Sequence, residues 1–165
     1  GLWTALQLKE KQPALNIVLI EKELCGSGAS GRNGGCMIPL TTKFSSMKKI
    51  VGEKDAFNMV AASEQAIYKI KDFCDKHNID AQIRIDGCFY TTTNKTQKGI
   101  FNNLIKDLNN SNINSLKNIS RAEVQAKTGS LKNTGGHYSP LSGSLHPGLL
   151  VRGLKKIAEK KGVKI

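Results

Sequence analysis

Hydrophobic and polar positions divide the first forty residues into a helix, a strand and a glycine-rich loop. Apolar residues recur at helical spacing over residues 2–11, and Pro13 favours an end to that helix before it. Residues 17–20 form an unbroken apolar run, typical of a strand that is buried on both faces of a parallel sheet. Residues 22–39 then carry five glycines among small polar side chains, and a long glycine loop in a compact domain usually has a function.

The middle of the chain alternates between helical and extended patterns. Helical spacing of apolar residues predicts a helix over 54–77, and a second helix is expected over 95–108. Residues 83–92 read as a strand that bends at Gly87. The Asn-rich stretch 109–118 is expected to be a polar connection with little capacity for burial.

The last third of the chain begins with a helix signal. Ser120 and Glu123 have the spacing of a capping box, which predicts a short helix over 121–127. Residues 135–140 are expected to form a strand or a turn. A longer helix is predicted to run from residue 147 to residue 161.

That longer helix has signals at both ends. Pro147 suits the first helical position, Gly162 suits the stop, and residues 163–165 open another strand. His146, directly before the proline, is explained by its position at the helix start. A role close to a functional site stays open as the alternative.

The chain has 165 residues, a size that fits one domain with a real core, and a formal net charge of +12. No run of about 18 to 20 apolar residues is present, so no membrane span is expected. The basic charge is compatible with a nucleic-acid-binding module. However, only four of the 25 basic residues are Arg, the lysines are scattered and aromatic residues make up 5%. Biased composition is therefore the preferred explanation, and no nucleic-acid partner is expected.

The four cysteines contain no CxxC pair, and no histidine lies at a zinc-ligand interval from them, so no metal site is predicted. The first twenty residues carry charges and lack a cleavage-site pattern, which argues against a signal peptide. We therefore expect thiols in a reducing compartment and a cytoplasmic protein.

Glu21 ends the predicted strand about twenty positions after Gly1, which is the spacing of a dinucleotide site. In such a site a helix N-terminus faces the pyrophosphate and the acid accepts hydrogen bonds from ribose hydroxyls. On spacing alone, a glutamate that merely ends a strand is equally consistent. The glycine-rich loop favours the dinucleotide site, because its backbone N–H groups, small polar side chains and one guanidinium can wrap around an anionic, planar ligand. The residues concerned are Ala29, Ser30, Gly31, Arg32, Asn33, Gly34 and Gly35.

The stretch LNIVLIEKELCGSGASGRNGGCMIP, residues 15–39, resembles the second strand and flavin loop of FAD-dependent oxidoreductases of the D-amino-acid-oxidase type. Its ASGRNGG segment is most similar to the gamma-glutamylputrescine oxidoreductase-like branch. Residues 135–165 resemble the family's segment that leaves the substrate domain and returns to the flavin domain through a helix. Members carry a first strand and two further glycines before the position of Gly1, and continue beyond that of Ile165. The sequence is therefore expected to be a fragment of a longer reading frame.

The resemblance implies an α/β fold and FAD as the cofactor. A partial Rossmann-type FAD-binding domain, residues 1–50 plus 140–165, is expected to be interrupted by an α+β substrate-side segment, residues 51–139. Gly1 then corresponds to the last glycine of the dinucleotide fingerprint and Glu21 to the ribose-binding acid. The segment from Ala29 to Gly35 corresponds to the loop that contacts the flavin.

The activity implied is oxidation of a primary or secondary amine or an amino acid, by hydride transfer to the flavin and hydrolysis of the imine formed. No His, Glu or Asp is placed well enough to be assigned as a catalytic base. The electron acceptor, oxygen or a respiratory chain, stays open. One alternative is a flavoprotein of the same fold that acts on a 2-hydroxy acid or glycerol-3-phosphate. A basic nucleic-acid-binding module is the less favoured alternative.

Overall fold

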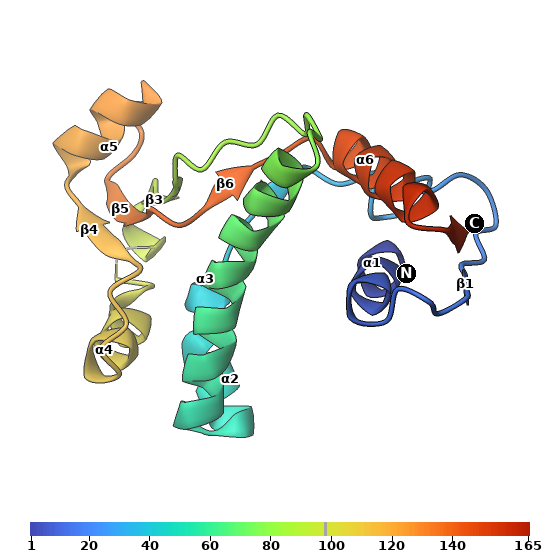
Figure 1. Cartoon of the computed structure of the whole chain (residues 1–165). Coiled ribbons are helices and arrows are strands. Elements are labelled where there is room, and N and C mark those ends of the chain that lie inside the picture. Colours follow the sequence, from blue (N-terminus) through green and yellow to red (C-terminus); the bar gives the residue numbers. More distant parts are fainter. Residues whose placement is uncertain (98) are drawn as a thin grey trace. The chain divides into compact units, whose positions relative to one another are not determined.

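A computed structural model describes residues 1–97 and 99–165, which form two compact units (Figure 1). The first unit contains residues 1–36, 69–84 and 144–165, and the second contains residues 37–68 and 85–143. These limits differ from the predicted division into 1–50 plus 140–165 and 51–139, because residues 69–84 belong with the first unit and residues 37–50 and 140–143 with the second. The predicted division, as an assignment of domains, stays a prediction.

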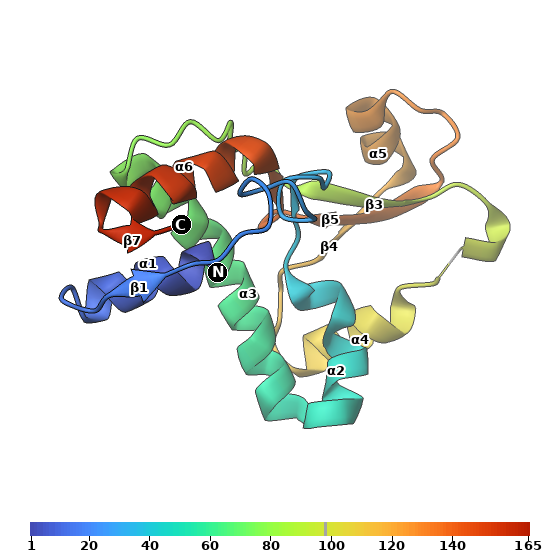
Figure 2. The same ribbon diagram turned by 90° about the vertical axis from the view of Figure 1, so that its right-hand side faces the viewer.

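The first unit consists of two helices beside a parallel pair of short strands. Its elements are α1 (Leu2–Lys11), β1 (Ile17–Val18), α6 (Pro147–Lys160), β7 (Val163–Lys164) and the last turns of α3 (Glu53–Lys76). β1 and β7 pair in parallel with Ile17 opposite Val163, although most of the chain lies between them. α1 and α6 lie side by side in both ribbon views (Figures 1 and 2). Their facing residues Ala5, Leu6, Leu154 and Ala158 form the core of this unit.

The apolar run 17–20 is not buried on both faces, so that prediction was wrong. Ile17 and Leu19 pack on the core, whereas the side chains of Val18 and Ile20 are 68% and 93% exposed. The alternation arises because successive strand residues point to opposite faces, and α1 and α6 cover only one of them. Among the described residues, β7 is the only strand that pairs with β1.

The helix ends of the first unit match the predicted signals. α1 ends at Lys11, before Pro13, and Pro147 is the first residue of α6. His146 caps α6, because its Nδ1 accepts the N–H of Leu149 at 3.3 Å. Gly162 follows the helix with a φ of +79°, a conformation that glycine adopts without strain. The predicted role of His146 as a helix-start residue is confirmed.

The second unit combines helices with a three-stranded antiparallel sheet of order β3-β5-β4. Its elements are the 3₁₀ turns η1 (Leu40–Lys43) and η2 (Lys95–Gln97), α2 (Phe44–Val51), most of α3, β3 (Cys88–Thr92), α4 (Asn102–Asn110), β4 (Lys117–Ile119), α5 (Arg121–Thr128) and β5 (Gly135–Ser139). Two short strands, β2 (Cys36–Met37) and β6 (Gly143–Ser144), lie at points where the chain passes from one unit to the other. The core of this unit contains Phe44, Val60, Leu104 and Leu108.

Three predictions in the second unit need correction. The helix expected over 95–108 is a 3₁₀ turn followed by α4, and its residue 98 lies outside the described residues. The strand expected over 83–92 begins only at Cys88, after Gly87 takes a φ of +87°. The connection 109–118 does contribute to burial, because Ile113 and Leu116 join the core cluster. Two apolar side chains are enough to anchor an otherwise polar segment. Among residues 1–97 and 99–165, no helix combines the length and apolar character that crossing a bilayer requires.

The capping box at the start of α5 is confirmed. The Ser120 hydroxyl accepts the N–H of Glu123 at 3.2 Å, and the Glu123 carboxylate accepts the N–H of Ser120 at 2.8 Å. Ser120→Ala removes the acceptor for the N–H of Glu123, so we expect a loss of about 1 kcal/mol in the free energy of unfolding. Denaturant unfolding measures this loss. Ser120→Asn, which keeps a capping oxygen, should unfold close to wild type, and equal losses in both variants would contradict the assignment.

Candidate functional site

A cavity of about 500 Å³ in the first unit brings together residues that are distant in the sequence. Gly1 at the start of α1, Glu21 just after β1 and Ser30 in the glycine-rich loop all line it. The wall is completed by Leu2, Trp3, Leu19, Ile20, Cys25, Gly26, Leu150, Val151 and Leu154. The cavity wall therefore combines apolar side chains with polar groups of the backbone, of Glu21 and of Ser30.

The N-terminus of α1 contributes unpaired backbone donors to this cavity. The first N–H groups of an α-helix have no intrahelical acceptor, and Gly1 as the N-cap residue provides no side chain that could cap them. Such a terminus attracts an anion through its N–H groups and through the helix dipole. A Cβ on Gly1 would lie 3.3 Å from Cδ1 of Leu19, so a side chain here would press on the residue that follows β1.

Glu21 lies at the carboxyl end of β1, where ligands bind in open α/β sheets. Its side chain is exposed, and its Oε1 accepts the N–H of Glu23 at 3.2 Å. A carboxylate oxygen has more than one acceptor site, so this hydrogen bond is compatible with a further bond from a ligand hydroxyl. The position agrees with the predicted role of a ribose-binding acid, which stays a prediction.

The glycine-rich loop is held by hydrogen bonds of its own. The N–H of Gly31 donates to the carbonyl of Gly28 at 3.2 Å, and the carbonyl of Gly35 accepts the N–H of Leu145 at 2.9 Å. Asn33 bonds to the loop backbone on both sides of itself. The loop thus has a defined shape, and its last residue is tied to the segment that leads into α6.

The predicted loop residues occupy different environments. Only Ser30 lines the cavity. Ala29, Arg32, Asn33 and Gly34 are exposed, Gly31 is half-buried, and Gly35 is buried. The structure therefore brings Gly1, Glu21 and Ser30 together, and places the remaining predicted residues outside the cavity wall.

The sequence analysis missed nine of the twelve wall residues, and three of these show the reason. Cys25 and Gly26 come from the start of the loop, and Val151 comes from α6. A Cβ on Gly26, whose φ is +98°, would lie 3.2 Å from Cγ1 of Val151, so the loop rests closely on α6. The glycine density around position 26 was a usable signal. The contact with Val151 was not, because it depends on how distant parts of the chain pack.

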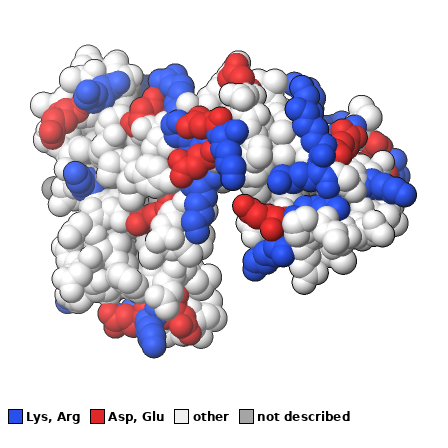
Figure 3. Space-filling model, in the orientation of Figure 1, with Lys and Arg blue, Asp and Glu red and all other residues white. Residues whose placement is uncertain are grey.

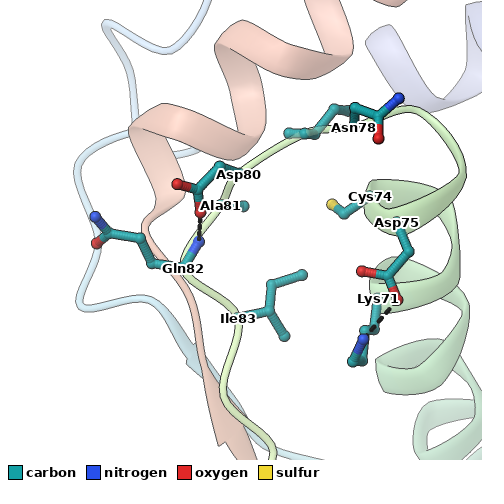
Figure 4. A pocket seen from close by; sticks show the side chains of 9 residues that line it. Lys71, Cys74, Asp75, Asn78, Asp80, Ala81, Gln82 and Ile83 are labelled. Carbon is teal, nitrogen blue, oxygen red and sulfur yellow. Dashed lines mark hydrogen bonds and ion pairs between the residues drawn. The ribbon is translucent and has the colours of Figure 1, made fainter.

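A second cavity in the same unit, of about 580 Å³, lies between the end of α3 and residues 78–83 (Figure 4). The charged groups of this cavity have partners, since Lys71 pairs with Asp75 and Asp80 accepts the N–H of Gln82 at 3.1 Å. The sulfur of Cys74 belongs to this cavity, and burial raises the pKa of the thiol. Cys74 therefore stays protonated and unreactive at neutral pH. None of the predicted site residues lines this cavity.

Solved structures of flavoenzymes share the fold of this chain. Glycine oxidase from Bacillus cereus ATCC 14579 is 18% identical, with a TM-score of 0.69, and L-amino acid deaminase from Proteus vulgaris, with its specific insertion sequence deleted, is 19% identical, with a TM-score of 0.77. The dithionite-reduced L-alpha-glycerophosphate oxidase from Mycoplasma pneumoniae, solved with FAD bound, is 17% identical, with a TM-score of 0.72. Each alignment covers 100% of this chain, and 43%, 41% and 41% of the respective neighbour. The chain thus spans less than half the length of these neighbours.

No curated protein sequence matches the chain. The model of the DAO family, described as FAD dependent oxidoreductase, matches residues 1–165, which is the whole chain. The predictions of the family, of its α/β fold and of FAD as its cofactor are therefore confirmed. The chain belongs to the DAO family of FAD-dependent oxidoreductases.

Proposed function

We propose that the complete protein oxidises an amine or an amino acid, and that this chain binds the FAD in the cavity lined by Gly1, Glu21 and Ser30. The observation that carries the proposal is their convergence on one cavity. They supply a helix N-terminus, a carboxylate and a hydroxyl, which are the groups that a dinucleotide needs.

Each group has a separate task in the proposed site. The N–H groups that follow Gly1 bind the pyrophosphate, the Glu21 carboxylate accepts a ribose hydroxyl, and the Ser30 hydroxyl donates to a phosphate oxygen. Arg32 is exposed and lies two residues after Ser30 in the sequence, and in the proposed site its guanidinium adds a charge-assisted contact to phosphate. The backbone N–H groups of Ala29, Arg32 and Gly34 are the other proposed donors of the loop, since those of Gly31 and Gly35 donate to the carbonyl of Gly28 and to Oδ1 of Asn33. A bound flavin supplies the acceptor for a hydride from the carbon beside the substrate nitrogen, and water hydrolyses the imine formed.

The substrate class is supported by the neighbours of similar fold. Glycine oxidase and L-amino acid deaminase are named for amino-acid substrates. L-alpha-glycerophosphate oxidase is named for a phosphorylated alcohol, which keeps glycerol-3-phosphate as the second candidate substrate. We favour the amine or amino-acid substrate, because the resemblance of residues 15–39 points to that branch.

The direct test is anaerobic reduction of the bound flavin in the complete protein. Amines, amino acids, 2-hydroxy acids and glycerol-3-phosphate are mixed separately with the oxidised enzyme, and the visible absorbance of the flavin is followed. Bleaching by an amine or amino acid, with release of ammonia or a smaller amine, is the expected result. Bleaching by glycerol-3-phosphate alone would replace this proposal with the second candidate. Adding oxygen or a quinone to the reduced enzyme then identifies the electron acceptor.

The charge distribution gives little support to a nucleic-acid-binding surface. On the face drawn in Figure 3, acidic side chains lie among the basic ones in each unit, so neither unit shows a continuous basic surface there. Binding of a polyanion relies on clustered basic groups with stacking aromatic residues. A net charge of +12 without such clustering is better explained by composition.

A further inference from the structure

The side-chain amide of Asn33 forms hydrogen bonds with the backbone of the glycine-rich loop. Its Nδ2 donates to the carbonyl of Ala29 at 2.9 Å and to that of Ser30 at 3.2 Å. Its Oδ1 accepts the N–H of Gly35 at 2.8 Å. An amide NH₂ has two protons, so both donors of Asn33 are used within the loop. We propose that Asn33 is a positioning residue, which folds the loop into the shape that binds the coenzyme and does not itself contact it; this inference rests on the proposed function.

Gly31 and Gly35 allow the backbone of the loop to adopt the conformation that Asn33 holds. A Cβ on Gly31 would lie 2.2 Å from the carbonyl oxygen of Gly26, and a Cβ on Gly35 would lie 1.9 Å from the carbonyl oxygen of Leu145. Both separations are far inside van der Waals contact. The space beside these two glycines is therefore filled by protein backbone, and glycine is required there for the loop to close.

Gly28, by contrast, has no atom within 4 Å of the position of a Cβ, and its φ lies outside the left-handed range. Alanine fits there without collision. The loop thus contains glycines that its fold requires and a glycine that it does not, which provides a matched control.

The bonds of Asn33 hold Ser30, the residue of the Ala29–Gly35 segment that lines the cavity. Asn33 holds the carbonyls of Ala29 and Ser30 from one side and the N–H of Gly35 from the other. Gly35 is in turn tied to Leu145, directly before the His146 cap of α6. Ser30 therefore keeps its place in the cavity wall through a connection that runs from α6 through Gly35 to Asn33. Loss of Asn33 releases that connection, although Asn33 itself is outside the cavity wall.

The test combines two readouts in the same protein. The first is amide hydrogen exchange at Gly35 without FAD, and the second is the Kd for FAD. Asn33→Ala should speed exchange at Gly35, because the acceptor of that N–H is removed, and should weaken FAD binding about tenfold. Asn33→Asp keeps an acceptor for Gly35 and loses the two donors. It should therefore retain slow exchange at Gly35 while still binding FAD more weakly. Gly28→Ala should match wild type in both readouts.

Weaker FAD binding of Asn33→Ala with unchanged exchange at Gly35 would overturn the inference, because Asn33 would then act as a direct ligand. Unchanged values in both readouts would overturn it as well. Wild-type protein that fails to bind FAD would contradict the proposed function instead. The exchange measurement would still decide whether Asn33 holds the loop.

Discussion

Gly35→Ala is expected to lower the free energy of unfolding by roughly 2 to 4 kcal/mol, because two penalties add at this position. The φ of Gly35 is +70°, a left-handed conformation that costs an L-residue roughly 1 to 2 kcal/mol. The new Cβ would also lie 1.9 Å from the carbonyl oxygen of Leu145, so the loop or the start of α6 has to shift. Denaturant unfolding of the FAD-free protein measures the loss.

Gly28→Ala is the matched control for this prediction. With no atom within 4 Å of its Cβ, this variant should stay within about 0.5 kcal/mol of wild type. The Gly35→Ala protein should also lose FAD affinity, because the displaced loop no longer presents Ser30 to the cavity. An unfolding midpoint equal to that of wild type would show that the contact between Gly35 and Leu145 is not needed for the fold.

Glu21→Ala is expected to weaken FAD binding roughly 10- to 100-fold, the loss that a hydrogen bond to a charged group commonly brings. The carboxylate lines the cavity and is exposed, so its removal leaves no buried group unpaired and should barely change stability. Titration of the FAD-free protein with FAD, followed by flavin fluorescence, gives the Kd.

Glu23→Ala is the control, because it removes one negative charge, as Glu21→Ala does. Glu23 is exposed, lies two residues after Glu21 and does not line the cavity. The FAD affinity of the Glu23→Ala protein should therefore equal that of wild type. Equal losses in both variants would point to a general effect of net charge. An unchanged Kd for Glu21→Ala would remove Glu21 from the site.

The elements that could be predicted from the sequence are those with local signals. α1 ends before Pro13, α5 begins with the Ser120 capping box, and α6 begins at Pro147. Each signal acts within a few residues of chain, through a backbone restriction or a capping bond. The surroundings of residues 17–20 could not be predicted in this way, because a strand's burial depends on which elements cover each face of the sheet.

In the candidate site, too, features set by local sequence could be predicted and features set by long-range packing could not. The spacing of Gly1 and Glu21 is set by one helix and the following strand, so together with the glycine-rich loop it was a local signal that both residues belong to one site. The contact of Gly26 with Val151 needs α6 to return from more than a hundred residues away. The internal bonds of Asn33 were also beyond prediction, because composition marks an amide as a possible ligand and only the folded loop shows where its hydrogen bonds go.

The most direct test of the account is to titrate isotope-labelled, FAD-free protein with FAD and map which backbone amides change in the NMR spectrum. The account predicts that the largest changes fall on Leu2 at the start of α1, on Glu21 and on Ser30. Residues 78–83, which line the cavity shown in Figure 4, should be unaffected. Saturable changes at residues 78–83 with none at Glu21 or Ser30, or no change at any residue, would contradict it.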